Sequence, residues 1–151
     1  MSVSPQKIKE LRDMTGAGVI NCKKALEEAE GSMEKAQLLL REKGKASALK
    51  KAARDTSQGL VHAYIHNGDK VGALVKVLCE TDFVARTPEF GSLVHNIAMQ
   101  VAALRPETLD ELLASEYIKD PKKKISDLMA EAVTQMGENI KVGEFVIYEI
   151  Q

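Results

Sequence analysis

The spacing of the apolar residues changes once along this chain, and that change constrains the fold more than any other feature. Before residue 44 the apolar side chains recur every three or four positions, which is the period of an amphipathic α-helix. From residue 60 they alternate through LVHAYIH and KVGALVKVLCE, two runs joined by Asn67-Gly68-Asp69, as in a β-hairpin. The sequence therefore predicts a helical unit followed by a domain that contains a sheet.

Residues 1–44 are predicted to form a bundle of three short helices. Ser4-Pro5 begins the first, because the Ser side chain can cap a free amide and Pro needs no hydrogen bond at the first helical position. The three helices are expected to end at Gly16, Gly31 and Gly44, since glycine readily adopts the left-handed conformation. The predicted core residues of the bundle are Ile8, Leu11, Val19, Cys22, Leu26, Ala29, Ala36, Leu39 and Leu40.

Residues 45–58, KASALKKAARDTSQ, have almost no large apolar side chain and are predicted to be a solvated basic linker helix. The cations Lys45, Lys50, Lys51 and Arg54 are of the type that contacts phosphate. No aromatic side chain accompanies them to stack on bases, so a solvated charge run is favoured and direct nucleic-acid binding is not expected.

Residues 59–151 are predicted to form an α+β domain in which helices cover a three-stranded antiparallel sheet. Thr87-Pro88 opens a helix, TLDELLAS gives a shorter one, and Asp120-Pro121 breaks the chain. The final run EFVIYEI is the third strand. One apolar stripe comprises Phe90, Leu93, Val94, Ile97, Ala98, Val101 and Ala102, and a second, ended by Gly137, comprises Ile125, Leu128, Met129, Ala132, Val133 and Met136.

The composition excludes several classes of protein. No apolar run approaches the roughly 18 residues that cross a bilayer, and no signal sequence opens the chain, so a cytoplasmic protein is expected. Cys22 and Cys79 are far apart and are expected to be buried free thiols. Residues 1–58 carry 12 positive and 8 negative side chains, a net of +4, whereas residues 59–151 carry 9 and 14, a net of -5. This asymmetry favours two functional parts.

The sequence gives no sign of covalent, metal or cofactor chemistry. It has no Walker motif, and Gly16-Ala17-Gly18 lacks the third glycine of a dinucleotide site. His62 and His66 have the spacing of a zinc-binding helix, but on a strand they would lie about 13 Å apart. His95 is expected to be a partly buried structural residue. We therefore expect no enzyme, no metal and no cofactor.

The stretch Thr81-Asp82-Phe83-Val84 is the remaining candidate. Phe is costly to leave in water and Asp is costly to bury, yet both stand between a strand and a helix. Phe83 belongs neither to the strand alternation before it nor to the helical stripe after it. Two interpretations remain: the ring packs under the helix while Asp82 binds loop amides, or the ring protrudes and enters a pocket on a partner.

Three segments of the chain resemble the family of translation elongation factor Ts. They are IKELRDMTGAGVINCKKALEEAEG, CETDFVAR and MGENIKVGEF, and in this order they span nearly the whole sequence. The resemblance implies an N-terminal bundle similar to ubiquitin-associated domains, a linker helix and an α+β core. It also implies a role in protein biosynthesis, as the guanine nucleotide exchange factor of elongation factor Tu, without covalent catalysis.

The resemblance also implies where the partner binds. Asp82 and Phe83 of the Thr81–Val84 motif would reach the nucleotide domain of elongation factor Tu, with the ring near its magnesium site. In the bundle, Val19, Ile20 and Lys23 would contact a surface helix of the same partner, with Arg12 as a further candidate. Many relatives have Met-Met-Asp where this chain has Val19-Ile20-Asn21.

The resemblance implies a noncovalent homodimer as well. Relatives often have a long helical insertion before the last core helix or a second copy of the core, and here only some 20 residues join Leu104 to Ile125. In single-core relatives, two chains are similar to the two halves of the longer proteins. Some are linked by a cysteine where this chain has Val146, so its dimer would be noncovalent, through the open edge of the last strand.

Two other classes of function stay open at this stage. A plain adaptor would bind ubiquitin-like or nascent-chain partners through the bundle, without any effect on nucleotide release. An RNA-binding protein would use the basic linker, and its binding would depend steeply on salt.

Overall fold

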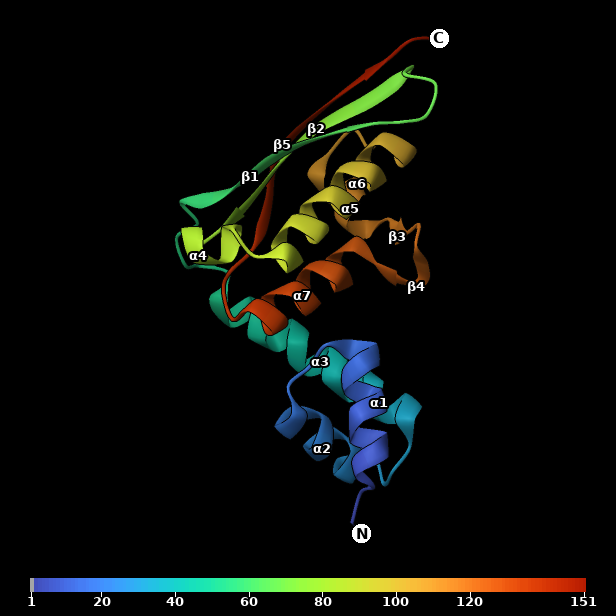
Figure 1. Ribbon diagram of the computed structural model, residues 1–151, viewed down its shortest axis with the longest axis vertical. Helices are drawn as coiled ribbons and strands as arrows, with labels where there is room; N and C mark the ends of the chain where they lie inside the picture. Colours follow the sequence, from blue (N-terminus) through green and yellow to red (C-terminus); the bar gives the residue numbers. More distant parts are fainter. Residues whose placement is uncertain (1) are drawn as a thin grey trace.

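The computed structural model describes residues 2–151, which form a helical N-terminal part and a larger part built on a sheet (Figure 1). The elements, in chain order, are α1 (Pro5–Thr15), α2 (Val19–Glu28), α3 (Met33–Lys51), β1 (Gln58–Ile65), β2 (Val71–Cys79), α4 (Asp82–Ala85), α5 (Pro88–Leu104), α6 (Leu109–Ala114), β3 (Glu116–Tyr117), β4 (Asp120–Lys124), α7 (Ile125–Met136) and β5 (Lys141–Glu149).

Local capping chemistry fixes most helix ends, as the sequence predicted. The Ser4 hydroxyl accepts a hydrogen bond from the Lys7 backbone N–H at 3.3 Å, and Thr87 caps α5 in the same way. Gly16 and Gly137 follow α1 and α7 with left-handed φ values of 68° and 72°. These ends depend on residues within one helical turn, which explains why the sequence alone reveals them.

The predicted end of the third helix at Gly44 is wrong. Helix α3 continues through this residue to Lys51, so the first half of the predicted linker helix is the second half of α3. Gly44 is buried, and a β-carbon there would lie 3.2 Å from the Thr134 hydroxyl of α7. Glycine thus allows α3 and α7 to approach closely, and the tertiary contact overrides its weak helix propensity.

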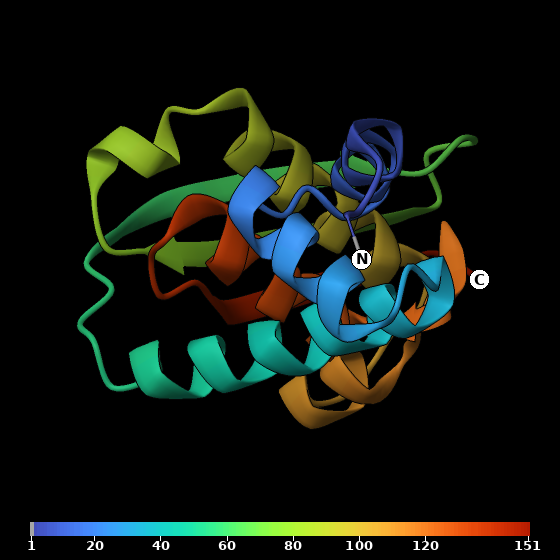
Figure 2. The same ribbon diagram turned by 90° about the horizontal axis from the view of Figure 1, so that it is seen from below.

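Most residues after Gly44, up to position 58, are exposed as predicted, and the others are only partly buried. Ala48 packs against the core of the larger part, and α3 runs past the bundle and along that core in Figure 2. The helix stops at Lys51, and β1 begins at Gln58. A division into domains at residues 44 and 58 stays a prediction.

Two separate hydrophobic cores form, one in each part. The bundle core is built around Leu11, Cys22 and Leu26, which are fully buried. Val19 does not belong to it, contrary to the prediction, because its side chain is 50% exposed. Cys79 is buried in the other core, so both cysteines are free and buried, as predicted. The three-helix arrangement is present, and its likeness to ubiquitin-associated domains stays a prediction.

The larger part confirms the α+β prediction. Its three strands are antiparallel in the order β1-β2-β5, with Tyr64 opposite Ala73 and Leu74 opposite Val146. Helix α5 packs against one face, and the inward residues of β2 are buried under it. The other face is uncovered in Figure 1. The β3–β4 hairpin was not predicted, because β3 has only two residues and β4, DPKKK, has no apolar alternation. Asp120-Pro121, expected to break the chain, instead begins β4.

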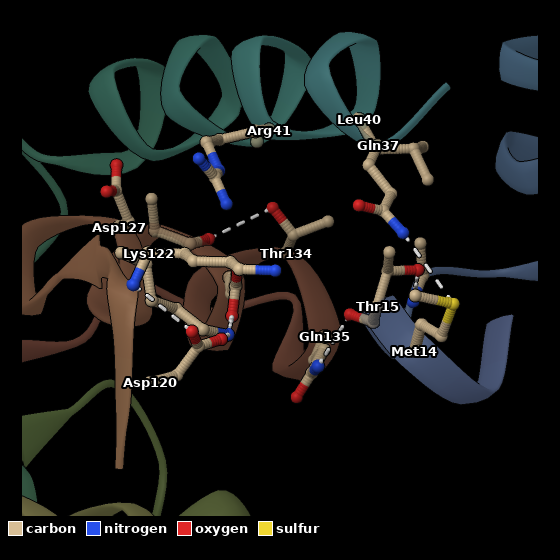
Figure 3. A pocket seen from close by; sticks show the side chains of 15 residues that line it. Met14, Thr15, Gln37, Leu40, Arg41, Asp120, Lys122, Asp127, Thr134 and Gln135 are labelled. Carbon is tan, nitrogen blue, oxygen red and sulfur yellow. Dashed lines mark hydrogen bonds and ion pairs between the residues drawn. The ribbon is translucent and has the colours of Figure 1, made fainter. Parts of the chain in front are cut away.

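The bundle meets the core at a seam that Figure 3 shows from close by. The Gln135 side chain of α7 donates a hydrogen bond to the Thr15 carbonyl at 3.1 Å. Beside it lies a pocket of about 270 Å³, lined from α1, α3, α7 and the β4 segment. Together with the continuous α3, this contact holds the bundle against the core.

The part of the chain that the structure describes has neither a membrane-spanning helix nor a cluster of metal ligands. Among residues 2–151, no helix combines the length and apolar character that a membrane crossing requires. Within the same range, no three His, Cys, Asp or Glu side chains gather as metal ligands would. His62 does contact His95, with 3.0 Å between Nε2 and Nδ1. His95 is exposed, so the prediction that it is partly buried is wrong.

Candidate partner-binding site

The Thr81–Val84 motif forms the capped start of α4, a four-residue helix that joins β2 to α5. The Thr81 hydroxyl accepts a hydrogen bond from the Val84 backbone N–H at 3.3 Å, and its φ and ψ are those of an extended cap residue. Figure 1 shows α4 at the edge of the molecule, beside one end of the sheet. The motif is therefore a defined turn of helix with one side free.

Phe83 is 84% exposed, more than any other large hydrophobic side chain among residues 2–151. The interpretation in which its ring packs under the helix is therefore wrong. Phe90, only seven positions later, is fully buried. The difference arises because α4 presents Phe83 away from the sheet, whereas α5 turns Phe90 toward it.

Asp82 also differs from the first interpretation, because its carboxylate binds a side chain instead of loop amides. It forms an ion pair with Arg86 at 3.2 Å, one turn further along, and both groups are largely exposed. Exposed pairs of this kind contribute little to stability. Arg86, which the sequence analysis did not single out, thus extends the charged surface beside Phe83.

Glu138, from the loop between α7 and β5, supports this turn from below. Its carboxylate accepts hydrogen bonds from the backbone N–H of Glu80 at 3.1 Å and of Thr81 at 3.0 Å. It accepts a third from the Thr81 hydroxyl at 2.7 Å. Hydrogen bonds to an ionised acceptor are about twice as strong as neutral ones, so this side chain fixes the backbone immediately before Phe83.

Asn139 and Glu80 complete the support. The Asn139 backbone N–H donates to the Glu80 carboxylate at 2.7 Å, and the Arg54 guanidinium lies 3.4 Å from the same oxygen. The Asn139 side chain donates to the carbonyls of Ala52 and Arg54. The Asn139 hydrogen bond holds the pKa of Glu80 below its usual value against partial burial, with help from Arg54. The Glu80 carboxylate therefore stays ionised. It keeps the end of β2, the loop before β5 and the stretch after α3 joined to one another.

Cys79 closes the network on the core side. Its thiol donates to the Thr81 carbonyl at 3.2 Å. Burial raises the pKa of this thiol, and the nearby Glu138 carboxylate raises it further. Cys79 therefore stays protonated and acts as a donor, without the thiolate that nucleophilic chemistry would need.

The supporting roles of Glu80, Glu138 and Asn139 were not predictable from the sequence. Glu80 and Glu138 are 58 positions apart, and no periodic pattern relates them. The one signal available was the segment MGENIKVGEF, which carried part of the resemblance and contains Glu138 and Asn139. It gave no indication of which residues they would bind.

The bundle candidates lie together at the start of α2. Val19 is 50% and Ile20 is 70% exposed, and Lys23 follows one turn later, where it pairs with Glu27 at 3.8 Å. Arg12 is exposed on α1. Two apolar side chains and a lysine on one helix face form a surface suited to binding another helix.

A shallow cavity of about 440 Å³ lies between the two candidate surfaces. It is lined by Gly16, just before α2, and by Val84, Thr87 and Met136 on the side of the Phe83 turn. Val84 packs against the core, so it supports the turn instead of protruding from it.

Comparison with known proteins matches the architecture to one family. The family model "Elongation factor TS" matches residues 80–151. "Elongation factor Ts" of Thermoanaerobacter sp. (strain X514) is 43% identical over 192 residues, which cover 97% of this chain and 94% of the relative. The protein of the same name from Thermotoga maritima is 41% identical, covering 99% of this chain and 97% of the relative. This chain belongs to the elongation factor Ts family.

Membership in the elongation factor Ts family confirms the resemblance seen in the sequence. The matched range includes both the Phe83 turn and the loop that supports it. The alignments span more positions than the 151 residues of this chain, so these members of the family contain segments that it lacks.

Proposed function

We propose that this chain is a guanine nucleotide exchange factor that accelerates GDP release from elongation factor Tu during translation elongation. The observation that carries the proposal is the Phe83 ring, exposed in water on a turn that is fixed from below. The ring inserts beside the partner's magnesium and nucleotide site. Exposure of the ring to water is unfavourable in the free protein, and burial against the partner removes this unfavourable contribution.

The chain acts by differential binding, without covalent chemistry. Full burial of a Phe side chain is worth about 1.5–3 kcal/mol, and a turn that is already ordered loses little entropy on binding. The factor binds best to a conformation of elongation factor Tu in which magnesium and phosphate contacts are loosened. Because coupling between two ligands is reciprocal, incoming GTP weakens the factor's affinity by the same ratio and releases it.

The bundle supplies a second contact to the same partner. Val19, Ile20 and Lys23 contact a surface helix of elongation factor Tu, with Arg12 as a further candidate contact. Gly16, next to the bundle surface, and Val84, next to Phe83, line one cavity, which supports the proposal that one partner touches both. Two contacts on one partner orient the ring, which a single exposed side chain does not achieve.

Release of a fluorescent GDP analogue from purified elongation factor Tu, followed by stopped flow, tests the proposal. We expect this chain to accelerate release in a manner that depends on its concentration. Binding to elongation factor Tu with no acceleration would favour the adaptor. Binding to RNA with a steep salt dependence that persists after substitution of Phe83 would favour the third class of function.

We also propose that the chain forms a noncovalent homodimer, for which the structure suggests a broader surface than a strand edge. The uncovered face of the sheet presents Leu74, Val146 and Tyr148, which are 46%, 41% and 78% exposed, with Val61 and Ile65 beside them. Leu74 and Val146 are directly opposite each other across the strands. Two such faces pack against each other as in a sandwich.

The mass in solution, measured over a range of concentrations, tests the dimer. We expect Leu74→Lys to shift the protein to monomer, because the new charge would be buried in the interface. Leu38→Lys, at an exposed position of α3 away from the sheet, is the matched control. A monomeric wild-type protein at all concentrations would contradict the proposal.

A further inference from the structure

An apolar groove on another part of the surface is not used by the proposed exchange mechanism. It has a volume of about 520 Å³ and lies between the second half of α3, helices α6 and α7, and the start of β5. Its lining consists of Lys45, Ala48, Leu49, Ala52, Leu109, Leu113, Ser126, Met129, Ala130, Val133, Asn139, Ile140, Lys141 and Val142. Most of this surface is aliphatic, and a groove of this kind on a free protein marks a binding site.

The α3 wall of the groove has the geometry of a helix-packing surface. Lys45, Ala48, Leu49 and Ala52 follow one another at i, i+3, i+4 and i+7, a stripe about 10 Å long. The two alanines are small and permit a close approach of a second helix. Leu49 is 77% exposed, more than any other leucine among residues 2–151, so it stands at the rim as an anchor without a partner.

The opposite wall comes from α6 and the floor from α7 and β5. Leu109 and Leu113 of α6 face the groove one turn apart, and Leu109 is 38% exposed. The floor is formed by Met129 and Val133 of α7 with Val142 of β5, all nearly buried. A stripe of apolar side chains along a helix fits between two such walls.

The charge of the groove selects its occupant. Both charged residues in the lining are lysines, and no carboxylate lines it. Lys45 lies 3.5 Å from Asp127 and from Glu42, whereas Lys141 has no carboxylate within 4.0 Å among residues 2–151. Two carboxylates therefore balance Lys45, whereas the unpaired Lys141 makes the rim positive on the β5 side, where it would attract acidic groups beside a partner's apolar stripe.

We propose that this groove binds an acidic amphipathic α-helix of another protein. A second copy of this chain is disfavoured, because a twofold interface would place the lysines of one groove against those of the other. Nucleic acid is disfavoured because no aromatic side chain lines the groove. The inference does not rest on the exchange function, since the groove contains neither Phe83 nor the Val19–Lys23 surface.

A pair of synthetic peptides tests the proposal. The first is a labelled helix of about 20 residues, long enough to be helical in isolation, with leucines at i, i+3, i+4 and i+7 and glutamates flanking them. The second has lysine in place of each glutamate. By fluorescence anisotropy we expect the acidic peptide to bind at least about 10-fold more tightly at low salt, with a difference that shrinks as salt increases. Equal binding of both, or no binding of the acidic peptide, would overturn the proposal.

Two variants locate the peptide on this chain. Leu49→Glu removes an apolar anchor and adds a repulsive charge, so we expect it to weaken the acidic peptide at least about 10-fold. Leu38→Glu on the same helix, 57% exposed and outside the lining, should bind like the wild type. Both positions are exposed enough that circular dichroism should show an unchanged fold. Equal effects of the two variants would show that the peptide binds elsewhere and would overturn the proposal.

Other occupants give distinct results in the same experiments. A change in solution mass caused by Leu49→Glu would mean that a second copy covers the groove. Competition by RNA or by anionic lipid vesicles stronger than that of unlabelled acidic peptide would assign the surface to those ligands. Each of these results would overturn the proposal, and none requires elongation factor Tu, so the exchange function can fail or succeed separately.

Discussion

Replacement of Phe83 by alanine separates the exposed-ring hypothesis from a structural role. The ring is 84% exposed, so only about one sixth of its surface contributes to the stability of the free protein. If full burial is worth about 1.5–3 kcal/mol, the substitution should lower the free energy of unfolding by about 0.5 kcal/mol or less. The cap at Thr81 and the support from Glu138 use backbone and other side chains and should persist.

The same substitution should have a much larger effect on exchange. When the partner covers the exposed five sixths of the ring, about 2 kcal/mol of interaction is lost with the alanine variant. A difference of 1.4 kcal/mol is tenfold, so the acceleration of GDP release at subsaturating factor should fall about 30-fold. Stopped-flow release of a labelled GDP measures this, and urea unfolding measures the stability.

Two control variants make the result interpretable. Phe90→Ala removes a fully buried ring and should cost about 3–5 kcal/mol of unfolding free energy. Ile118→Ala changes an exposed residue of the β3–β4 turn, on the opposite side of the molecule from α4 in Figure 1, and should alter neither quantity. Our reasoning is refuted if Phe83→Ala unfolds as readily as Phe90→Ala, or if it folds and releases GDP as fast as the wild type.

The network below the turn gives two further predictions. Glu138→Ala removes three hydrogen bonds to the backbone and side chain of residues 80–81. Nucleotide exchange should therefore slow although Phe83 is intact, and the free energy of unfolding should fall by about 1–3 kcal/mol. Amide hydrogen exchange at Thr81 would report the loosened turn, and an unchanged rate of nucleotide release would argue that Glu138 does not position Phe83. The pKa of Glu80 is lowered in the folded state, so its contribution to stability is complete above the ordinary value of 4.5 and is lost as the pH falls through the folded value. Wild-type stability should therefore drop in urea titrations as the pH falls below the ordinary value of 4.5, and Glu80→Gln should flatten that drop. Asp127 leaves a remainder, because its pKa is also lowered: burial raises it, but the Lys124 amide and the cations Lys45 and Arg41 outweigh that effect. A drop of equal size in the variant would contradict the assignment to Glu80.

Helix ends and strand alternation were predictable because their causes lie within a few residues. A Ser or Thr hydroxyl caps the amide three positions later, as Ser4 and Thr87 do, and the pattern carries its own geometry. The buried stripe that begins at Phe90 was predictable for the same reason. The end of α3 was not predictable. Gly44 stays helical because the close approach of Thr134, on a helix far along the chain, favours a residue without a side chain there.

The candidate site also has one feature that the sequence predicted and others that depend on long-range contacts. The sequence singled out Phe83 because it fitted neither neighbouring period, but it left open whether the ring was inside or outside. That choice depends on the direction in which α4 leaves the sheet, which Glu138 and Asn139 fix from distant positions. Long-range hydrogen bonds leave no periodic trace in a sequence, so their partners could not be paired in advance.

The sequence by itself thus determined the longer helices, the three strands of the main sheet, the fold class and the residue that does not belong to the core. The tertiary structure alone decided that α3 is continuous, that the Phe83 turn is held from below, and that a lysine-rimmed apolar groove stays open beside α6. The physical reason is range: propensity, capping and alternation act between near neighbours, whereas close approach and burial are set by segments that meet only in the folded state.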